Sequence, residues 1–194
     1  MTEILDEAPG WDAIETAVAA VSDDHDPLHW GTDSLPGQGL HGMSAYRCPG
    51  YWLLVTFGLT ELFGKDSANP HVSGWGFEFT MRVPRDGAQP PAWSLRLLEQ
   101  LAGYVFSTGR PFADGHRMDP GGPITGQPDT RLRALALAAD PHLPAISSPH
   151  GAARFLTVVG ITPEEMERMK ATSTAEVLGE LARHSPLLVT DPTR

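Results

Sequence analysis

Cysteine is nearly absent from this 194-residue sequence, which contains a single one, Cys48. A lone cysteine cannot form a disulfide within the chain, and it excludes a zinc site built from several cysteines of one chain. We expect Cys48 to be a buried structural thiol. Long hydrophobic runs are also missing, since no stretch approaches the roughly 18 apolar residues that a membrane helix requires. Because the acidic start lacks the basic and apolar regions of a secretory signal, we expect a cytoplasmic protein.

Lysine and arginine are missing from residues 1–46, where nine Asp and Glu residues occur. Over the whole chain 24 acidic residues face 14 basic ones, and the formal net charge is −10. Nucleic acid is a poor partner for such a chain because its phosphates repel acidic side chains. Charge favours a basic protein partner. The simpler interpretation is that acidic surfaces keep the protein soluble.

Motifs of catalysis and cofactor binding are missing as well. There is no G-x-S-x-G nucleophile elbow, no phosphate-binding loop and no dinucleotide-binding glycine pattern, so we expect no catalytic residue and no cofactor. The densest set of potential metal ligands is His25, Asp26 and His29. Pro27 interrupts the helical turn that would bring the two histidines together, so we expect a turn here and no metal site. A metal-dependent enzyme that uses these three residues is an alternative.

Four segments carry helix signals. Apolar residues recur at helical spacing after Pro9 and Pro91, which predicts helices over residues 9–22 and from about residue 91 to just before Gly109. Thr162 and Ser173 each stand three residues before a glutamate, which is the capping-box pattern. Two further helices are therefore expected after Thr162 and Ser173.

Strands are expected where aromatic and β-branched residues cluster. Pro49-Gly50 is a turn signal that makes residues 43–47 and 51–58 an antiparallel hairpin. The other expected strands are residues 75–83, 116–118, 131–140, 153–159 and 187–189. Length favours one domain, which we place at residues 9–192 after an N-terminal tail of residues 1–8.

The segment from Tyr51 to Arg82 holds many of the aromatic residues. Those expected in the core are Phe57, Phe63, Phe77 and Phe79. The alternation in G-F-E-F-T places Glu78 on the opposite face of its strand from Phe77 and Phe79, and we expect its side chain in solvent.

The same segment resembles the Suppressor of fused family. Its two longest motifs are T-F-G-L-T-E-L-F-G at residues 56–64 and S-G-W-G-F-E-F-T at residues 73–80. Shorter matches occur in the same order along the chain, among them Asp26-Pro27-Leu28, Asp140-Pro141 and Val159-Gly160-Ile161-Thr162. The similarity covers about residues 9–192.

This resemblance implies an α+β fold, a mixed, largely antiparallel sheet flanked by helices, like the N-terminal domain of the animal protein. The animal protein sequesters a transcription factor by clamping a short peptide between two domains, and the peptide adds as a strand. This chain has the length of the stand-alone bacterial members, which are suggested to act as immunity proteins against polymorphic toxins. The implied function is that of a non-enzymatic protein-binding domain that neutralises a partner toxin. The candidate ligands are a basic toxin domain and a peptide captured by strand addition.

One departure concerns the strand at Tyr51. Animal members read close to H-W-H-Y-I-S-F-G-L there, so a His and a Tyr are replaced by Leu53 and Leu54, and we expect a different ligand. Asp66 lies near the family's acidic partner-contact position. The residues that we predict to contact a partner are Tyr51, Leu53, Leu54, Glu61, Asp66, Asp23, Asp24 and Asp26.

Overall fold

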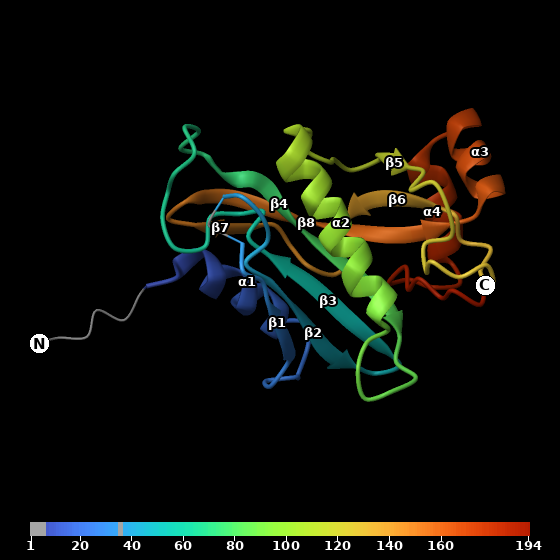
Figure 1. The fold of residues 1–194 in the computed structure, drawn as a ribbon, viewed down its shortest axis with the longest axis horizontal. Helices are drawn as coiled ribbons and strands as arrows, with labels where there is room; N and C mark the ends of the chain where they lie inside the picture. Colours follow the sequence, from blue (N-terminus) through green and yellow to red (C-terminus); the bar gives the residue numbers. More distant parts are fainter. Residues whose placement is uncertain (1–6, 35–36) are drawn as a thin grey trace, which may run out of the picture.

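Eight strands form one mixed sheet in the part of the chain that the computed structural model describes, residues 7–34 and 37–194 (Figure 1). The strand order is β1-β2-β3-β4-β8-β6-β5, and β7 pairs with β8 outside this path. Strands β4 and β8 are parallel, and the other pairs are antiparallel. The predicted mixed, largely antiparallel α+β fold is confirmed. The strands are β1 (Leu28–Gly31), β2 (Gly42–Cys48), β3 (Tyr51–Phe57), β4 (Val72–Pro84), β5 (Arg117–Met118), β6 (Ala134–Ala139), β7 (Ile146–Ser148) and β8 (Gly151–Ile161).

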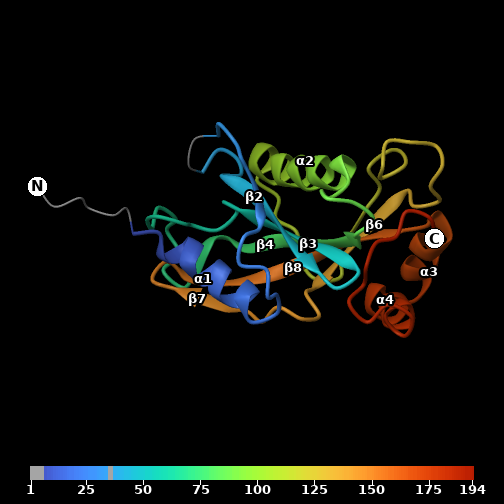
Figure 2. The ribbon, with the colours of Figure 1, turned by 90° about the horizontal axis from the view of Figure 1, so that it is seen from below.

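Four helices cover this sheet in the same part of the chain. They are α1 (Pro9–Ala19), α2 (Ala92–Thr108), α3 (Pro163–Ala171) and α4 (Thr174–Ala182). Figure 2 shows α2 on one face of the sheet and α1 and the α3–α4 pair on the other face, at opposite ends. The central strands are therefore covered on both faces. No helix in the described residues is long and apolar enough to cross a membrane.

Helix α2 is positioned by its buried stripe. Leu98, Leu101 and Val105 follow one another at helical spacing and are at most 3% exposed. The helix ends where Gly109 adopts a left-handed conformation with φ of 68°, and the Gly109 amide donates to the Val105 carbonyl. Glycine suits this position because it has no Cβ to strain. The predicted helix is confirmed, and one of its faces lies against the sheet.

The two predicted helix starts near the C-terminal end are also confirmed. The Thr162 hydroxyl accepts a hydrogen bond from the Glu165 amide at 3.2 Å, and the Glu165 carboxylate accepts one from the Thr162 amide at 2.8 Å. This pair is a complete capping box at the start of α3. The Ser173 hydroxyl likewise accepts from the Glu176 amide at the start of α4.

The predicted hairpin is confirmed, with Cys48 opposite Tyr51 and Cys48 buried. The second strand of this hairpin, β3, shows that one prediction is wrong. Leu53 and Leu54 were expected to face a partner, yet they are 1% and 0% exposed. Leu54 packs in the cluster under α2, and Leu53 packs in the cluster under α1. Because β3 is covered on both faces, neither leucine reaches the surface.

One predicted strand is absent, and the first helix is shorter than predicted. Residues 187–189 form no strand: the Leu188 amide donates to the Ser185 carbonyl in a turn, and Leu188 has a φ of 54°. Its side chain packs into the α3–α4 cluster, which explains the apolar sequence. The first helix ends at Ala19 and not at residue 22. Residues 1–6 of the predicted N-terminal tail lie outside the described residues.

Candidate functional site

The segment that follows β3 folds back around the carboxylate of Glu61. This carboxylate accepts hydrogen bonds from the Lys65 ammonium at 2.8 Å and from the amides of Asp66 at 2.7 Å and Gly74 at 3.0 Å. The amide and hydroxyl of Ser67 donate to it as well. One side chain thus ties residues 61–67 to the beginning of β4.

The electrostatics of Glu61 match this role. Burial raises the pKa of the carboxyl, but the bond from Lys65 and the amide donors outweigh burial and hold the pKa at about 2. The side chain is 10% exposed. Glu61 also lines the pocket described below, so its contact with a partner stays a prediction, although its oxygens are used within the loop.

A second carboxylate, that of Glu78, lies on β4 beneath the same loop. It is 1% exposed, so the prediction that it is solvated is wrong. The alternation of residues along β4 correctly placed Glu78 opposite Phe77 and Phe79. However, α1 and the loop after β3 cover the sheet face that Glu78 occupies. Its oxygens accept hydrogen bonds from Thr56, Gly58 and Thr60. Burial raises its pKa to about 7 against these bonds.

Two glycines of the family motifs are required by close backbone approaches. Gly58 has a φ of 120°, and a Cβ there would lie 2.6 Å from the His41 amide nitrogen. Gly74 has a φ of 54°, and a Cβ there would lie 2.5 Å from the Leu59 carbonyl oxygen. Side chains at either position would push apart the loop, β4 and the β1–β2 connection. The glycines of F-G-L-T and S-G-W-G therefore shape the surface next to them.

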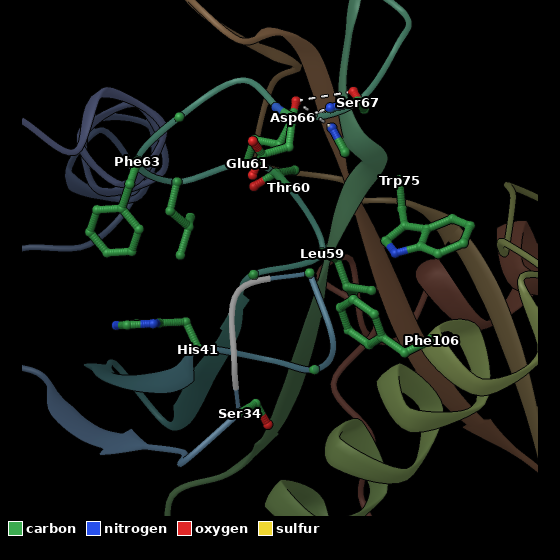
Figure 3. A pocket seen from close by; sticks show the side chains of 16 residues that line it. Ser34, His41, Leu59, Thr60, Glu61, Phe63, Asp66, Ser67, Trp75 and Phe106 are labelled. Atoms are coloured by element: carbon green, nitrogen blue, oxygen red, sulfur yellow. Dashed lines mark hydrogen bonds between the residues drawn. The ribbon is translucent and has the colours of Figure 1, made fainter.

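That surface is a pocket of about 590 Å³. Figure 3 shows His41 opposite Phe63 on one side and Trp75 beside Phe106 on the other, with Leu59 between them. The His41 and Phe63 rings are 5.2 Å apart, and those of Trp75 and Phe106 are 6.2 Å apart. The walls come from the β1–β2 connection, the loop after β3, the start of β4 and the end of α2. The pocket is thus an apolar depression where the end of α2 meets three segments from residues 34–75.

Phe63 lies at the edge of this pocket and is 44% exposed, and it is the one exposed large hydrophobic side chain among the described residues. The prediction that Phe63 belongs to the core is wrong, whereas Phe57, Phe77 and Phe79 are buried as expected. Asp66 also lines the pocket and is exposed. An exposed aromatic ring at the edge of an apolar pocket is typical of a binding surface.

Tyr51 and the three acidic residues predicted before β1 lie at the opposite end of β3, about 20 Å away by strand geometry. Tyr51, Asp23 and Asp24 line a depression of about 800 Å³ with Arg47 and His142. The structure therefore divides the predicted surface in two: Glu61 and Asp66 lie at the apolar pocket, and Tyr51 with two of the acidic residues lies at the second depression.

Asp24 forms hydrogen bonds and an ion pair within this second depression. The Arg47 amide donates to it at 2.7 Å, and the Arg47 guanidinium lies 3.1 Å from its carboxylate. Burial would raise the pKa of Asp24, but the bonds from Arg47 and the Asp26 amide lower it below its usual value. Asp23 and Asp26 are exposed, and the Asp26 carbonyl accepts from Arg47. Burial raises the pKa of Tyr51, and the neighbouring Cys48 adds to this effect.

The alternative metal site is not assembled. Among residues 7–34 and 37–194, no group of three or more His, Cys, Asp or Glu side chains is placed to hold a metal ion. His29 instead contacts the Ser44 hydroxyl at 2.9 Å and lies against the Trp11 ring. His25 and Asp26 are exposed before β1.

Sequence reasoning missed the roles of Trp75, Phe106 and His41 as pocket residues. Trp75 was expected as the first residue of a strand, and the other two carry no local signal. A signal did exist at Phe63, a lone aromatic residue between Glu61 and the polar run that begins at Gly64.

The sequence profile of the Suppressor of fused protein family matches residues 38–194. The Suppressor of fused homologs of Homo sapiens and Mus musculus are each 30% identical over 165 residues, which cover 79% of this chain and 34% of theirs. The chain therefore spans about a third of the length of these curated relatives.

Solved structures show the same fold. A chain in the crystal structure of the Sufu–Fu complex superposes with a TM-score of 0.86 at 26% identity, over 97% of this chain and 91% of that one. Drosophila Suppressor of Fused superposes with a TM-score of 0.87 at 26% identity, over 97% of this chain and 51% of that one. A homolog from Neisseria gonorrhoeae superposes with a TM-score of 0.64 at 16% identity, over 95% of this chain and 94% of that one. This likeness supports the fold alone.

Proposed function

Because the chain belongs to the Suppressor of fused family, we propose that it is a non-enzymatic protein-binding domain whose partner docks at the apolar pocket. The observation that carries this proposal is the position of Phe63, 44% exposed at the edge of a pocket of about 590 Å³. Burial of an exposed aromatic side chain is a frequent source of binding energy at protein interfaces.

The wall formed by the loop after β3 supports docking because internal hydrogen bonds already order it. Glu61 holds one side of the loop, and Glu78 holds the other. A surface that is formed before binding loses little conformational entropy when the partner arrives. One of the superposed structures is that of a complex of Sufu with Fu, and this supports a protein as the class of partner.

The partner that we propose is a basic toxin domain, which this protein binds and neutralises as an immunity protein in the bacterial cytoplasm. The net charge of −10 and the exposed Asp66 beside the pocket support a basic partner. Opposite charges would mainly accelerate the encounter, whereas burial of apolar side chains would supply affinity.

The test compares wild-type protein with Phe63→Glu as immobilised bait in lysate of the source cell. Ala175→Glu is the matched control, because Ala175 is an exposed residue in the first turn of α4, where a negative charge is favourable. We expect wild type and the control to retain a basic protein, and Phe63→Glu to bind it more weakly by about tenfold. Equal retention by all three proteins would contradict docking at the pocket.

Strand addition to the sheet edge is the second candidate. Strand β1 pairs with β2 on one side and stands at the end of the sheet in the described residues. Such an edge can pair with an extended peptide. A partner that Phe63→Glu retains as well as wild type would favour this edge over the pocket.

A further inference from the structure

The carboxylate of Glu78 is held by a set of donors that is divided unevenly between its oxygens. Oε1 accepts from the Gly58 amide at 2.9 Å, the Thr60 amide at 2.8 Å and the Thr60 hydroxyl at 2.7 Å. Oε2 accepts from the Thr56 hydroxyl at 2.6 Å. Two of the Oε1 donors are backbone amides and cannot turn away. The single donor on Oε2 is a hydroxyl, which can rotate.

Thr56 has a second acceptor within reach. Its Oγ1 lies 3.4 Å from the Phe79 carbonyl oxygen and accepts from the Phe79 amide at 2.8 Å. If Oε2 takes up a proton from water, the Thr56 hydroxyl can reverse, accept from Glu78 and donate to the Phe79 carbonyl. The site can therefore satisfy both the ionised and the protonated carboxyl without leaving a buried donor on Oε1 unpaired.

The same donors form part of the pocket wall. Gly58, Leu59 and Thr60 line the pocket, and the Leu59 carbonyl accepts from the Trp75 amide at 2.8 Å. Loss of negative charge on Glu78 weakens its hydrogen bonds to Gly58 and Thr60, because bonds to a charged acceptor are stronger than bonds to a neutral one. We propose that Glu78 is a reversible proton-binding site that couples solution pH to the 58–60 wall of the pocket.

The other charged groups near Glu78 are ion-paired, exposed or ionised throughout the pH range in which Glu78 titrates. Arg82 on the same strand is paired with Asp140, Arg154 on β8 is exposed, and Glu61 stays ionised with a pKa of about 2. Strand β3 carries no charged residue, and α1 turns the apolar Ile14 and Val18 toward this face. The charged residues of α1, Asp12 and Glu15, are exposed, as is His41 on the pocket wall. Burial is the largest influence on the pKa of Glu78 and raises it to about 7, in the range where cells hold their pH. The proposal concerns the pocket itself and does not depend on which partner occupies it.

The experiment is an NMR titration of the wild-type protein from pH 5 to pH 9. We expect the Glu78 side-chain carboxyl carbon, the Gly58 and Thr60 amides and the Trp75 indole to titrate with one shared midpoint within about one unit of pH 7. A Glu78 carboxyl carbon that does not titrate in this range would overturn the proposal. A carbon that titrates while the amides and the indole stay fixed would overturn the coupling to the pocket.

Variants separate the proton from the packing. Glu78→Gln keeps the Oε1 acceptor and presents an amide donor to Thr56, so its spectrum should resemble that of wild type at low pH and lose the shared titration. Thr56→Ser keeps the reversible hydroxyl and should keep the midpoint, whereas Thr56→Val removes it and should shift the midpoint upward. Identical midpoints in Thr56→Val and wild type would contradict the role of the hydroxyl. The wild-type titration stands as a test even if a variant fails to fold.

Discussion

Arg82 and Asp140 form an ion pair in which neither side chain is exposed to solvent. The guanidinium donates to the carboxylate through Nη1 at 2.8 Å and Nη2 at 2.9 Å, and the amides of His142 and Leu143 donate to the same carboxylate. Burial would raise the pKa of Asp140, but Arg82 lowers it below its usual value. This pair joins β4 to the chain after β6, on the sheet face between the α1 and α3–α4 clusters.

Removal of one partner of this pair should destabilise the protein strongly. Arg82→Leu leaves a buried carboxylate without its cation, and such a loss costs about 3–5 kcal/mol. Arg82→Leu with Asp140→Ala should cost less than the sum of the two single variants in denaturant unfolding. The exposed pair of Arg168 and Glu180 is the matched control and should show no measurable coupling. Additive costs at Arg82 and Asp140 would contradict the pairing.

The stability of the protein should fall as the pH rises from about 4.5 to about 7. The pKa of Glu78 is about 7 in the folded protein and 4.5 by its ordinary value, so the folded state binds the proton more tightly. Stability is therefore greatest below the lower value and is lost up to the higher one, by about 3 kcal/mol for a shift of this size. Unfolding in urea at a series of pH values measures this slope.

Glu78→Gln is the control for this prediction, since it has no proton to release. Its unfolding free energy should lack the decline between pH 4.5 and 7. Glu61 acts in the opposite sense, because its pKa of about 2 lies below its ordinary value of 4.5. Its contribution to stability is lost only as the pH falls from 4.5 to about 2. A decline of equal size in Glu78→Gln and wild type would assign the slope to other groups.

Glu61→Gln should loosen the loop without unfolding the domain. The substitution weakens the bonds that the carboxylate accepts from the amides of Asp66, Ser67 and Gly74. Hydrogen exchange of these amides should accelerate, while exchange in α2 should not change. Asp66→Asn changes an exposed carboxylate in the same loop and is the matched control. Equal exchange in Glu61→Gln and wild type would show that Glu61 does not organise the loop.

Alanine should act with opposite sign at two glycines. At Gly74, φ is 54° and the new Cβ would lie 2.5 Å from the Leu59 carbonyl oxygen, so Gly74→Ala should lose at least about 1–3 kcal/mol. Gly103 lies within α2 with nothing within 4 Å of a new Cβ. Gly103→Ala should gain up to about 1 kcal/mol from helix propensity. Thermal unfolding measures both, and a neutral Gly74→Ala would contradict the close approach of β4 to the loop.

Features encoded by neighbouring residues could be predicted from the sequence. Capping at Thr162 and Ser173 depends on residues three positions apart, and the Pro49-Gly50 turn lies within one hairpin. The turn at Leu188 was mistaken for a strand because the sequence is apolar there; the Leu188 side chain packs against α3 and α4, which no local pattern reveals.

The candidate site depended on contacts that are distant in sequence. The alternation of apolar and polar residues assigned Glu78 to the correct face of β4. Its side chain is nevertheless buried, because α1 and the loop after β3 cover that face. The same covering on both sides buried Leu53 and Leu54. Phe63 was assigned to the core from its residue type, whereas its exposure follows from the path that Glu61 imposes on the loop.

Site-specific photocrosslinking in the source cell tests docking at the pocket most directly. Benzoylphenylalanine in place of Phe63 keeps an aromatic ring at the edge of the pocket, and the same residue in place of Ala175 marks a surface on α4. The account predicts a covalent adduct with one basic protein from position 63 and none from position 175. No adduct from position 63, or the same adduct from both positions, would contradict a partner that docks at this pocket.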